Sequence, residues 1–195
     1  MRVLLIYCHP RADSFNAAVH RAVLQALHEA GHEVDDCDLH AEGFNPVLGA
    51  DELALYPQIP ANRAPVQGYV DRLLKAQALV FVFPVWNFGL PAMLKGWFDR
   101  VLLPGVSFDM SDPKHIRPGL THLRHVVAVT TYGTPRWRAW VLGDAPRTLM
   151  QRFMRRLTDG RARIRYLPLH GMNTASAAMR EAFLQRAAAA MRKIT

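Results

Sequence analysis

The sequence has few cysteines and no long hydrophobic run. Only Cys8 and Cys37 occur among 195 residues, and their spacing matches neither a metal-binding nor a redox motif. We therefore expect two buried free thiols in a reducing compartment rather than a disulfide framework. No stretch approaches the roughly 20 apolar residues of a membrane span, and the apolar run at 3–7 is too short for a secretory signal. The sequence thus predicts a cytoplasmic protein with no integral membrane segment.

Acidic residues are scarce relative to basic ones. The chain has 24 Lys and Arg against 16 Asp and Glu, a net charge of +8. The excess lies entirely in residues 111–195, which hold 16 basic and 4 acidic residues, whereas residues 1–110 hold 8 and 12. Such an asymmetry of charge is typical of proteins that bind a nucleic acid, a membrane surface or an anionic cofactor. It also occurs where the charge serves only solubility. Because no nucleic-acid recognition motif and no basic strand with interleaved aromatics occurs, we do not expect nucleic acid.

The chain also lacks the glycine-rich loops with which many proteins bind nucleotide phosphates, and its nine histidines show no metal-ligand spacing. We therefore expect no metal site. Half of the residues are hydrophobic and 21% are charged, which is typical of a globular protein with its own core. The length predicts a single domain over residues 1–195.

Short apolar segments alternate with amphipathic ones along the chain. Strands are predicted at residues 3–7, 33–39, 78–85, 125–131 and 163–167. Helices are predicted at residues 15–30, 70–74, 91–101, 143–157 and 178–194, with irregular segments at 40–65 and 103–120. This alternation predicts an α/β fold, a doubly wound five-stranded parallel sheet of order 2-1-3-4-5 with helices on both faces.

In such a sheet, ligands bind beyond the carboxyl ends of the strands, where the first and third strands diverge. This rule singles out three loops, at residues 9–16, 84–90 and 130–136. The first leads into a helix N-terminus, where free N–H groups and the helix dipole favour an anion, and Ser14 and Asn16 add polar groups. A capping loop that binds nothing fits this segment equally well.

The other two loops complement the first. Trp86 and Phe88 stand at the carboxyl end of a strand, where they can enclose a planar ring, and Asn87 can bond to its edge. Gly133 lets the backbone approach a ligand closely, beside two threonine hydroxyls. Taken singly, the segments also fit a hydrophobic turn and a polar loop. Together, the three loops favour a phosphorylated, planar, hydrogen-bonding ligand, and flavin mononucleotide (FMN) meets that description.

Three stretches carry a recognisable resemblance. They are His-Pro-Arg-Ala-Asp-Ser-Phe-Asn at 9–16, Phe-Pro-Val-Trp-Asn-Phe-Gly-Leu-Pro-Ala-Met-Leu-Lys-Gly-Trp-Phe-Asp-Arg-Val at 83–101 and Thr-Thr-Tyr-Gly at 130–133. The chain resembles the NAD(P)H:quinone oxidoreductases of the flavodoxin-like superfamily, which include DT-diaphorase and the ancillary reductases of potassium-efflux systems. The resemblance implies a homodimeric flavoenzyme that uses FMN, or alternatively FAD. It implies hydride transfer from NAD(P)H to the flavin, then two-electron reduction of a quinone by a ping-pong mechanism.

The resemblance also implies which residues bind the flavin. They are His9, Ser14, Phe15, Asn16, Pro84, Val85, Trp86, Asn87, Phe88, Thr130, Thr131, Tyr132 and Gly133. Mammalian members carry a Tyr and a His after the third loop, whereas Leu142 stands at the His position here and no Tyr follows. The catalytic candidates are therefore Gly133, whose backbone N–H would stabilise charge on the reduced flavin, and Tyr132.

The arginine-rich segment after the third loop leaves further alternatives open. It can favour NADPH by binding the 2′-phosphate, or form only a solvated helix face. The arginines concerned are Arg136, Arg138, Arg147, Arg152, Arg155 and Arg156. The competing functions are an azo- or nitroreductase on the same flavin, an electron carrier, and a regulatory subunit that docks on a membrane transporter. Electron carriers of this fold are commonly acidic, so the basic charge argues against that one.

Overall fold

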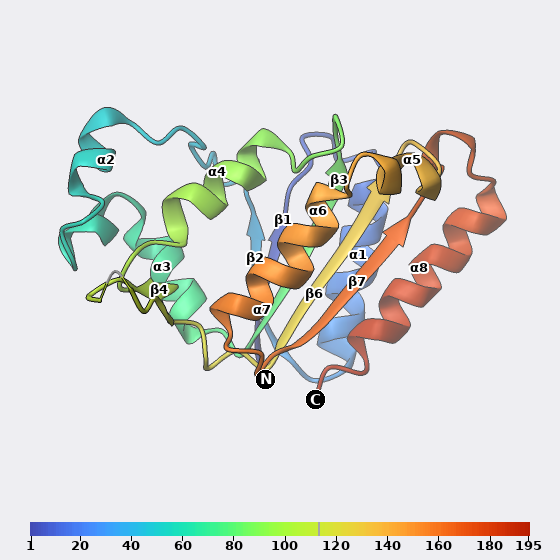
Figure 1. Cartoon of the computed structure of the whole chain (residues 1–195). Helices are drawn as coiled ribbons and strands as arrows, with labels where there is room; N and C mark the ends of the chain where they lie inside the picture. Colours follow the sequence, from blue (N-terminus) through green and yellow to red (C-terminus); the bar gives the residue numbers. More distant parts are fainter. Residues whose placement is uncertain (113) are drawn as a thin grey trace.

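Five parallel strands form the central sheet of the chain. They are β1 (Arg2–Tyr7), β2 (Glu33–Asp38), β3 (Ala78–Val85), β6 (His125–Tyr132) and β7 (Arg163–Leu169). The structure is a computed structural model that describes residues 1–112 and 114–195. The order of the strands across the sheet is β2-β1-β3-β6-β7 (Figure 1). The predicted doubly wound, flavodoxin-like order is therefore confirmed.

Helices cover both faces of the sheet because its central strands are apolar on both sides. One face packs against α3 (Gln67–Lys75), α4 (Ala92–Val101) and α7 (Met154–Leu157), and the other against α1 (Phe15–Glu29) and α8 (Ala177–Met191). Along β3, every residue up to Pro84 is buried. A strand that is covered on both faces loses the alternation of polar and apolar residues, which explains the continuous apolar run in the sequence.

Gly96 allows α4 to pack closely against the segment that follows β2. A Cβ atom at this position would lie 2.3 Å from the carbonyl oxygen of Pro46, which is far inside van der Waals contact. Trp97 and Phe98, the next two residues, are buried in the core on the same face of the sheet. The absence of a side chain at Gly96 therefore permits the close packing of α4 against this segment.

The bounds predicted for the helix at residues 143–157 are wrong. Gly143 and Asp144 have φ angles of +80° and +41°, which no helix residue adopts. The helical chain is instead divided into α5 (Arg136–Val141), α6 (Ala145–Thr148), a π-helical turn (Leu149–Phe153) and α7. The break separates an exposed helix, α5, from a partly buried one.

Three other segments differ from the sequence-based expectations. Segment 40–65 contains α2 (Ala50–Leu55) and the start of a 3-10 helix (Ala61–Val66). Segment 103–120 contains a short antiparallel pair, β4 (Phe108–Asp109) with β5 (Arg117–Pro118). The helix predicted over 178–194 is α8, which ends at Met191; Met179 near its start is 50% exposed, whereas Met191 is buried.

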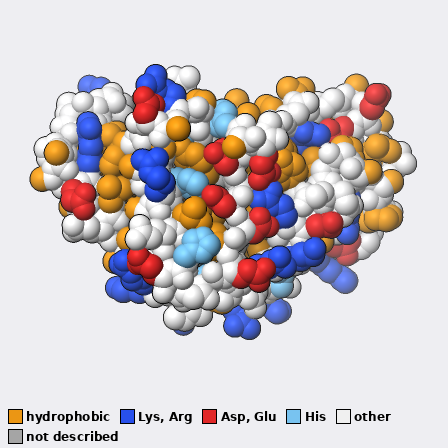
Figure 2. Space-filling model, turned by 180° about the vertical axis from the view of Figure 1, so that it is seen from behind, with side chains coloured by type: hydrophobic (Ala, Val, Ile, Leu, Met, Phe, Trp, Pro, Cys, Tyr) orange, Lys and Arg blue, Asp and Glu red, His pale blue; other side chains and the backbone are white. Residues whose placement is uncertain are grey.

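Within residues 1–112 and 114–195, no helix is long and apolar enough to cross a membrane. The rear face of the molecule carries acidic and basic side chains side by side, as Figure 2 shows, and is not a continuous basic surface.

Candidate functional site

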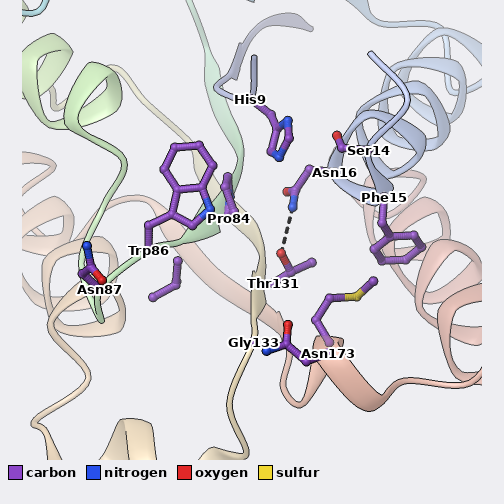
Figure 3. A pocket seen from close by; sticks show the side chains of 12 residues that line it. His9, Ser14, Phe15, Asn16, Pro84, Trp86, Asn87, Thr131, Gly133 and Asn173 are labelled. Carbon is purple, nitrogen blue, oxygen red and sulfur yellow. Dashed lines mark hydrogen bonds between the residues drawn. The ribbon is translucent and has the colours of Figure 1, made fainter. Parts of the chain in front are cut away.

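A cavity of about 700 Å³ opens at the carboxyl edge of the sheet, beyond β1, β3 and β6. Figure 3 shows side chains from all three strand ends turned toward it, with Trp86 on one side and Phe15 on the other. The lining residues are His9, Ser14, Phe15, Asn16, Pro84, Val85, Trp86, Asn87, Thr131, Gly133, Met172 and Asn173. The volume lies within the range of small-molecule and cofactor sites.

The loop from β1 to α1 supplies an anion-binding edge. Ser14 is the N-cap of the 15-residue helix α1, and its Oγ accepts a hydrogen bond from the Ala17 N–H at 3.1 Å. The remaining N–H groups of the first helical turn lie at the positive end of the helix dipole. This edge can therefore hold a phosphate without any lysine or arginine.

His9 enters the same edge as a neutral hydrogen-bond donor. Its Nδ1 accepts the Arg11 N–H at 3.1 Å, which leaves the ring hydrogen on Nε2. Burial lowers the pKa of His9 below its ordinary value, so the uncharged ring dominates at neutral pH. The ring also contacts Trp86 edge-on, with 5.7 Å between the ring centroids.

A tight turn carries Trp86 into the cavity. Asn87 and Phe88 have φ angles of +48° and +59°, and positive φ at both central positions is the signature of a type I′ hairpin turn. Two backbone hydrogen bonds of 3.2 and 2.9 Å between Trp86 and Gly89 close it. The turn fixes the direction of the Cα–Cβ bond of Trp86. The backbone geometry therefore helps to place the indole that forms this wall of the cavity.

The floor of the cavity is a buried polar pair. Asn16 Nδ2 donates to Thr131 Oγ1 at 2.8 Å, as the dashed line in Figure 3 marks. Asn16 is only 5% exposed, and its Oδ1 is buried without a hydrogen-bond partner in the described part of the chain. A buried acceptor without a donor costs free energy, so a ligand N–H or O–H at this point would be favoured.

Gly133 completes the floor at the end of β6. A Cβ atom there would meet the side-chain amide of Asn173 at 3.1 Å, which is tighter than ordinary contact. Glycine thus lets the β7–α8 loop approach the end of β6, and it leaves the Gly133 backbone at the cavity surface.

Ten of the thirteen sequence-predicted binding residues line this cavity. The other three, Phe88, Thr130 and Tyr132, are not among the lining residues. Successive side chains of a strand point to opposite faces, so Thr131 faces α1 while its two neighbours face α4 and α7.

The expectation that the Tyr132 side chain lies at the ligand site is therefore corrected. Tyr132 is buried on the other face, where its hydroxyl lies 2.5 Å from Asp144 Oδ1 and 2.5 Å from the Tyr166 hydroxyl. Burial, reinforced by Tyr166 and Asp144, raises the pKa of Tyr132 far above its ordinary value. Only its backbone, directly before Gly133, is near the cavity.

Sequence reasoning missed Met172 and Asn173. Both follow β7, which pairs with β6 in the sheet, so their position follows from the sheet order. The signal was available, because the carboxyl end of the fifth strand lies at the same edge as those of the first, third and fourth.

None of the described lining residues carries a charged side chain, apart from the titratable His9. No cluster of three or more His, Cys, Asp or Glu in the described ranges is placed to hold a metal ion. The site is thus suited to an organic ligand with a planar ring, hydrogen-bonding edges and a phosphate that helix α1 can bind.

Fold and site together define an α/β protein with a cavity suited to a nucleotide-like ligand at the carboxyl edge of a doubly wound sheet. The chain belongs to the flavodoxin-like fold family, whose model matches residues 1–194.

Among characterised relatives, the chain is 30% identical to "NAD(P)H dehydrogenase [quinone] 1" of Rattus norvegicus over 149 residues, 68% of this chain and 54% of that protein. The chain thus spans about half the length of the curated relatives that it matches. Among solved structures, it is similar to an NAD(P)H:quinone oxidoreductase from Methanothermobacter marburgensis, with a TM-score of 0.85, 27% identity and coverage of 100% and 99% of the two chains. An FMN-dependent NADH-azoreductase from Bacillus anthracis, solved in complex with FMN, shares the fold with a TM-score of 0.75 at 16% identity and 99% and 97% coverage.

Proposed function

We propose that this protein is a flavin-dependent NAD(P)H:quinone oxidoreductase. The observation that carries the proposal is the cavity itself: an aromatic-walled site that, apart from the titratable His9, is uncharged along its described lining, and whose anion-binding element is the start of α1. The similarity to proteins named as quinone-reducing NAD(P)H enzymes supports the same activity.

The residues present fit a flavin. The N–H groups of α1 and Ser14 would bind its phosphate, and Trp86 would lie against the ring system. The buried Asn16 Oδ1, which lacks a donor, would accept a hydrogen bond from the cofactor. We propose FMN as the cofactor. A neighbouring cavity of about 340 Å³ shares His9 with the first and offers room for the added nucleotide of FAD, which is the alternative.

The flavin, when bound, supplies the redox chemistry by accepting a hydride from NAD(P)H and passing two electrons to a quinone. The protein orients the reactants and sets the local electrostatics. Because Gly133 lines the cavity, its backbone N–H would stabilise negative charge on the reduced ring. We propose that NAD(P)H and quinone use the same open side of the cavity in turn, which makes the kinetics ping-pong.

The first test is the absorption spectrum of the purified protein, followed by identification of the released cofactor. Flavin bands and quinone-dependent oxidation of NAD(P)H are expected, with parallel double-reciprocal plots. The variant Asn16→Leu should bind flavin at least about tenfold more weakly, since it removes the side-chain amide, both its N–H donor and its oxygen acceptor, from a buried site. Gln25→Leu, on the exposed side of the same helix, is the control and should bind normally. A protein that takes up no flavin after reconstitution would overturn the proposal.

Related substrates, assembly and location complete the proposal. Azo and nitro compounds would be reduced at the same site, and substrate profiling ranks them against quinones. We propose a homodimer in the cytoplasm, supported by exposed apolar side chains such as Trp137 and by the free, buried thiols of Cys8 and Cys37. Sedimentation analysis and cell fractionation test these two points. Recovery of the chain with a membrane transporter would favour the docking alternative instead.

A further inference from the structure

A separate cavity, of about 320 Å³, lies beside the break between α5 and α6. We call it the arginine cavity. Its lining residues are Arg136, Trp140, Gly143, Asp144, Arg147, Thr148 and Arg152. None of these residues lines the first cavity, and none of them was assigned to the flavin.

The arginine cavity has an excess of positive charge. Arg147 Nε donates to Asp144 Oδ2 at 2.9 Å, and its guanidinium lies over the Tyr166 ring at 4.9 Å, so this arginine is neutralised and held in place. The side chains of Arg136 and Arg152 form no hydrogen bond or ion pair in the ranges that the structure describes. Two unneutralised guanidinium groups therefore face one small cavity, and such groups bind phosphate strongly through paired N–H donors.

Trp140 gives the same cavity an aromatic surface. Its indole, the largest of the side chains, is 78% exposed. It lies on the rim of the cavity rather than on a flat surface. An exposed indole beside guanidinium groups is suited to a ligand that joins a flat aromatic ring to a phosphate. An adenosine phosphate has that chemistry.

The two cavities adjoin the same strand end. Gly133 lines the first cavity, and Arg136, three residues later, lines the second, so their Cα atoms lie at most about 11 Å apart. Tyr132 connects them further, because its backbone precedes Gly133 and its hydroxyl bonds to Asp144 in the arginine cavity. A dinucleotide whose nicotinamide enters the first cavity can therefore extend its other end toward the second.

We propose that the arginine cavity binds the adenosine 2′-phosphate end of NADPH, which makes NADPH rather than NADH the preferred co-substrate. This inference rests on the proposed function. NADH offers only a hydroxyl at the 2′ position, so it gains nothing from Arg136 and Arg152. The other arginines of this segment, such as Arg155, do not line the cavity and have no part in the preference.

The test compares both co-substrates in the flavin-loaded enzyme. The wild type should show a kcat/KM for NADPH more than about tenfold above that for NADH, since charge-assisted bonds to phosphate are strong. Arg136→Met with Arg152→Met should lower kcat/KM for NADPH about tenfold or more and change that for NADH less than about twofold. Arg155→Met, an exposed arginine of α7, is the matched control and should change neither value. Equal efficiency with NADH and NADPH in the wild type would overturn the inference.

A binding measurement separates this inference from the flavin proposal. Calorimetry should show adenosine 2′,5′-bisphosphate binding more tightly than adenosine 5′-monophosphate, with the difference lost in the double variant. Discrimination of the 2′-phosphate in a protein that reduces no flavin would contradict the oxidoreductase proposal and support the anion site. Flavin reduction without such discrimination would overturn the anion site alone.

Discussion

The arginines of the two parts of the chain have different roles. Before residue 110, Arg72 is bound to Asp35 and Glu42, at 2.7 and 2.8 Å, and Arg100 is bound to Glu52 at 2.8 Å. After residue 110, Arg136 and Arg152 face a cavity and have no such partner within the described chain. The same side chain is thus a structural cross-link in one region and a group available to a ligand in the other.

This difference explains the charge asymmetry of the sequence. The first part of the chain has more acidic than basic residues, and its carboxylates hold the arginines that fix the segment after β2. The second part has four acidic residues for sixteen basic ones, so most of its cations have no carboxylate to bind. The net charge alone does not reveal this difference, because it counts the charges that are paired within the fold together with those that are free to bind a ligand.

The largest expected effect is a loss of stability when an arginine of the first part of the chain, one that is paired with a carboxylate, is replaced. The side chains of Arg100 and Glu52 are 9% and 12% exposed, so Arg100→Met leaves a carboxylate buried without a partner. The variant should lose about 3 kcal/mol of unfolding free energy, measured by urea denaturation. Arg100→Met combined with Glu52→Leu should recover most of the loss. A single variant as stable as the wild type would show that this arginine is not a cross-link.

The next effect concerns the polar cluster that separates the two cavities. Tyr132→Phe removes the hydroxyl that bonds to both Asp144 and Tyr166, and it should cost about 1–2 kcal/mol of unfolding free energy. Tyr56→Phe, whose hydroxyl forms no hydrogen bond among the residues described, is the control from the first part of the chain and should change stability by less than about 0.5 kcal/mol. Equal losses in the two variants would contradict the assigned contacts.

A smaller effect depends on pH. The His170 ring packs on Tyr132 with 4.4 Å between centroids, and burial lowers the pKa of His170 below the ordinary 6.5. The unfolded chain therefore binds a proton before the folded one does, so this contribution is intact above about pH 6.5 and is lost as the pH falls below it. His170→Gln should flatten the decline in stability below pH 6.5 by roughly a few tenths of a kcal/mol, since the group is partly solvated. His28→Gln, an exposed substitution, should leave the decline unchanged.

The smallest expected effect sharpens the comparison most. Arg152→Met and Arg155→Met should each change the unfolding free energy by less than about 0.5 kcal/mol, because neither arginine is paired with a carboxylate in the part of the chain that the structure describes. Urea denaturation of the two variants beside Arg100→Met is the measurement. A loss above about 1 kcal/mol for Arg152→Met would show that this arginine is also structural.

Much of the site could be predicted from the sequence because sheet order decides which loops meet. Asn16 and Thr131 are 115 residues apart, yet they form one hydrogen bond because α1 begins beyond the carboxyl end of β1, at the same edge of the sheet where β6 ends. Tyr132 could not be placed this way. It belongs to the last position of β6 rather than to the loop, and the alternation of a strand turns its side chain to the far face.

The break at Gly143 and Asp144 was also beyond the sequence pattern. The arginines from 147 to 156 fit a regular helix, and nothing in the residue pattern distinguishes the π-helical turn at Leu149–Phe153, where Met150 is buried in the core. Met172 and Asn173 have no distinctive residue-type signal, and their place follows from the pairing of β7 with β6.

The type I′ turn from Trp86 to Gly89 has a consequence for how quickly a cofactor can be exchanged. Two non-glycine residues, Asn87 and Phe88, hold positive φ angles there, and the turn keeps its shape through its own backbone hydrogen bonds. Because the conformational entropy of this loop is lost during folding, an incoming cofactor does not have to order it again. Reloading the protein with a flavin analogue should therefore proceed at a rate set by encounter and not by loop closure. The same rigidity makes the turn a suitable fixed point for grafting a different ring-binding side chain.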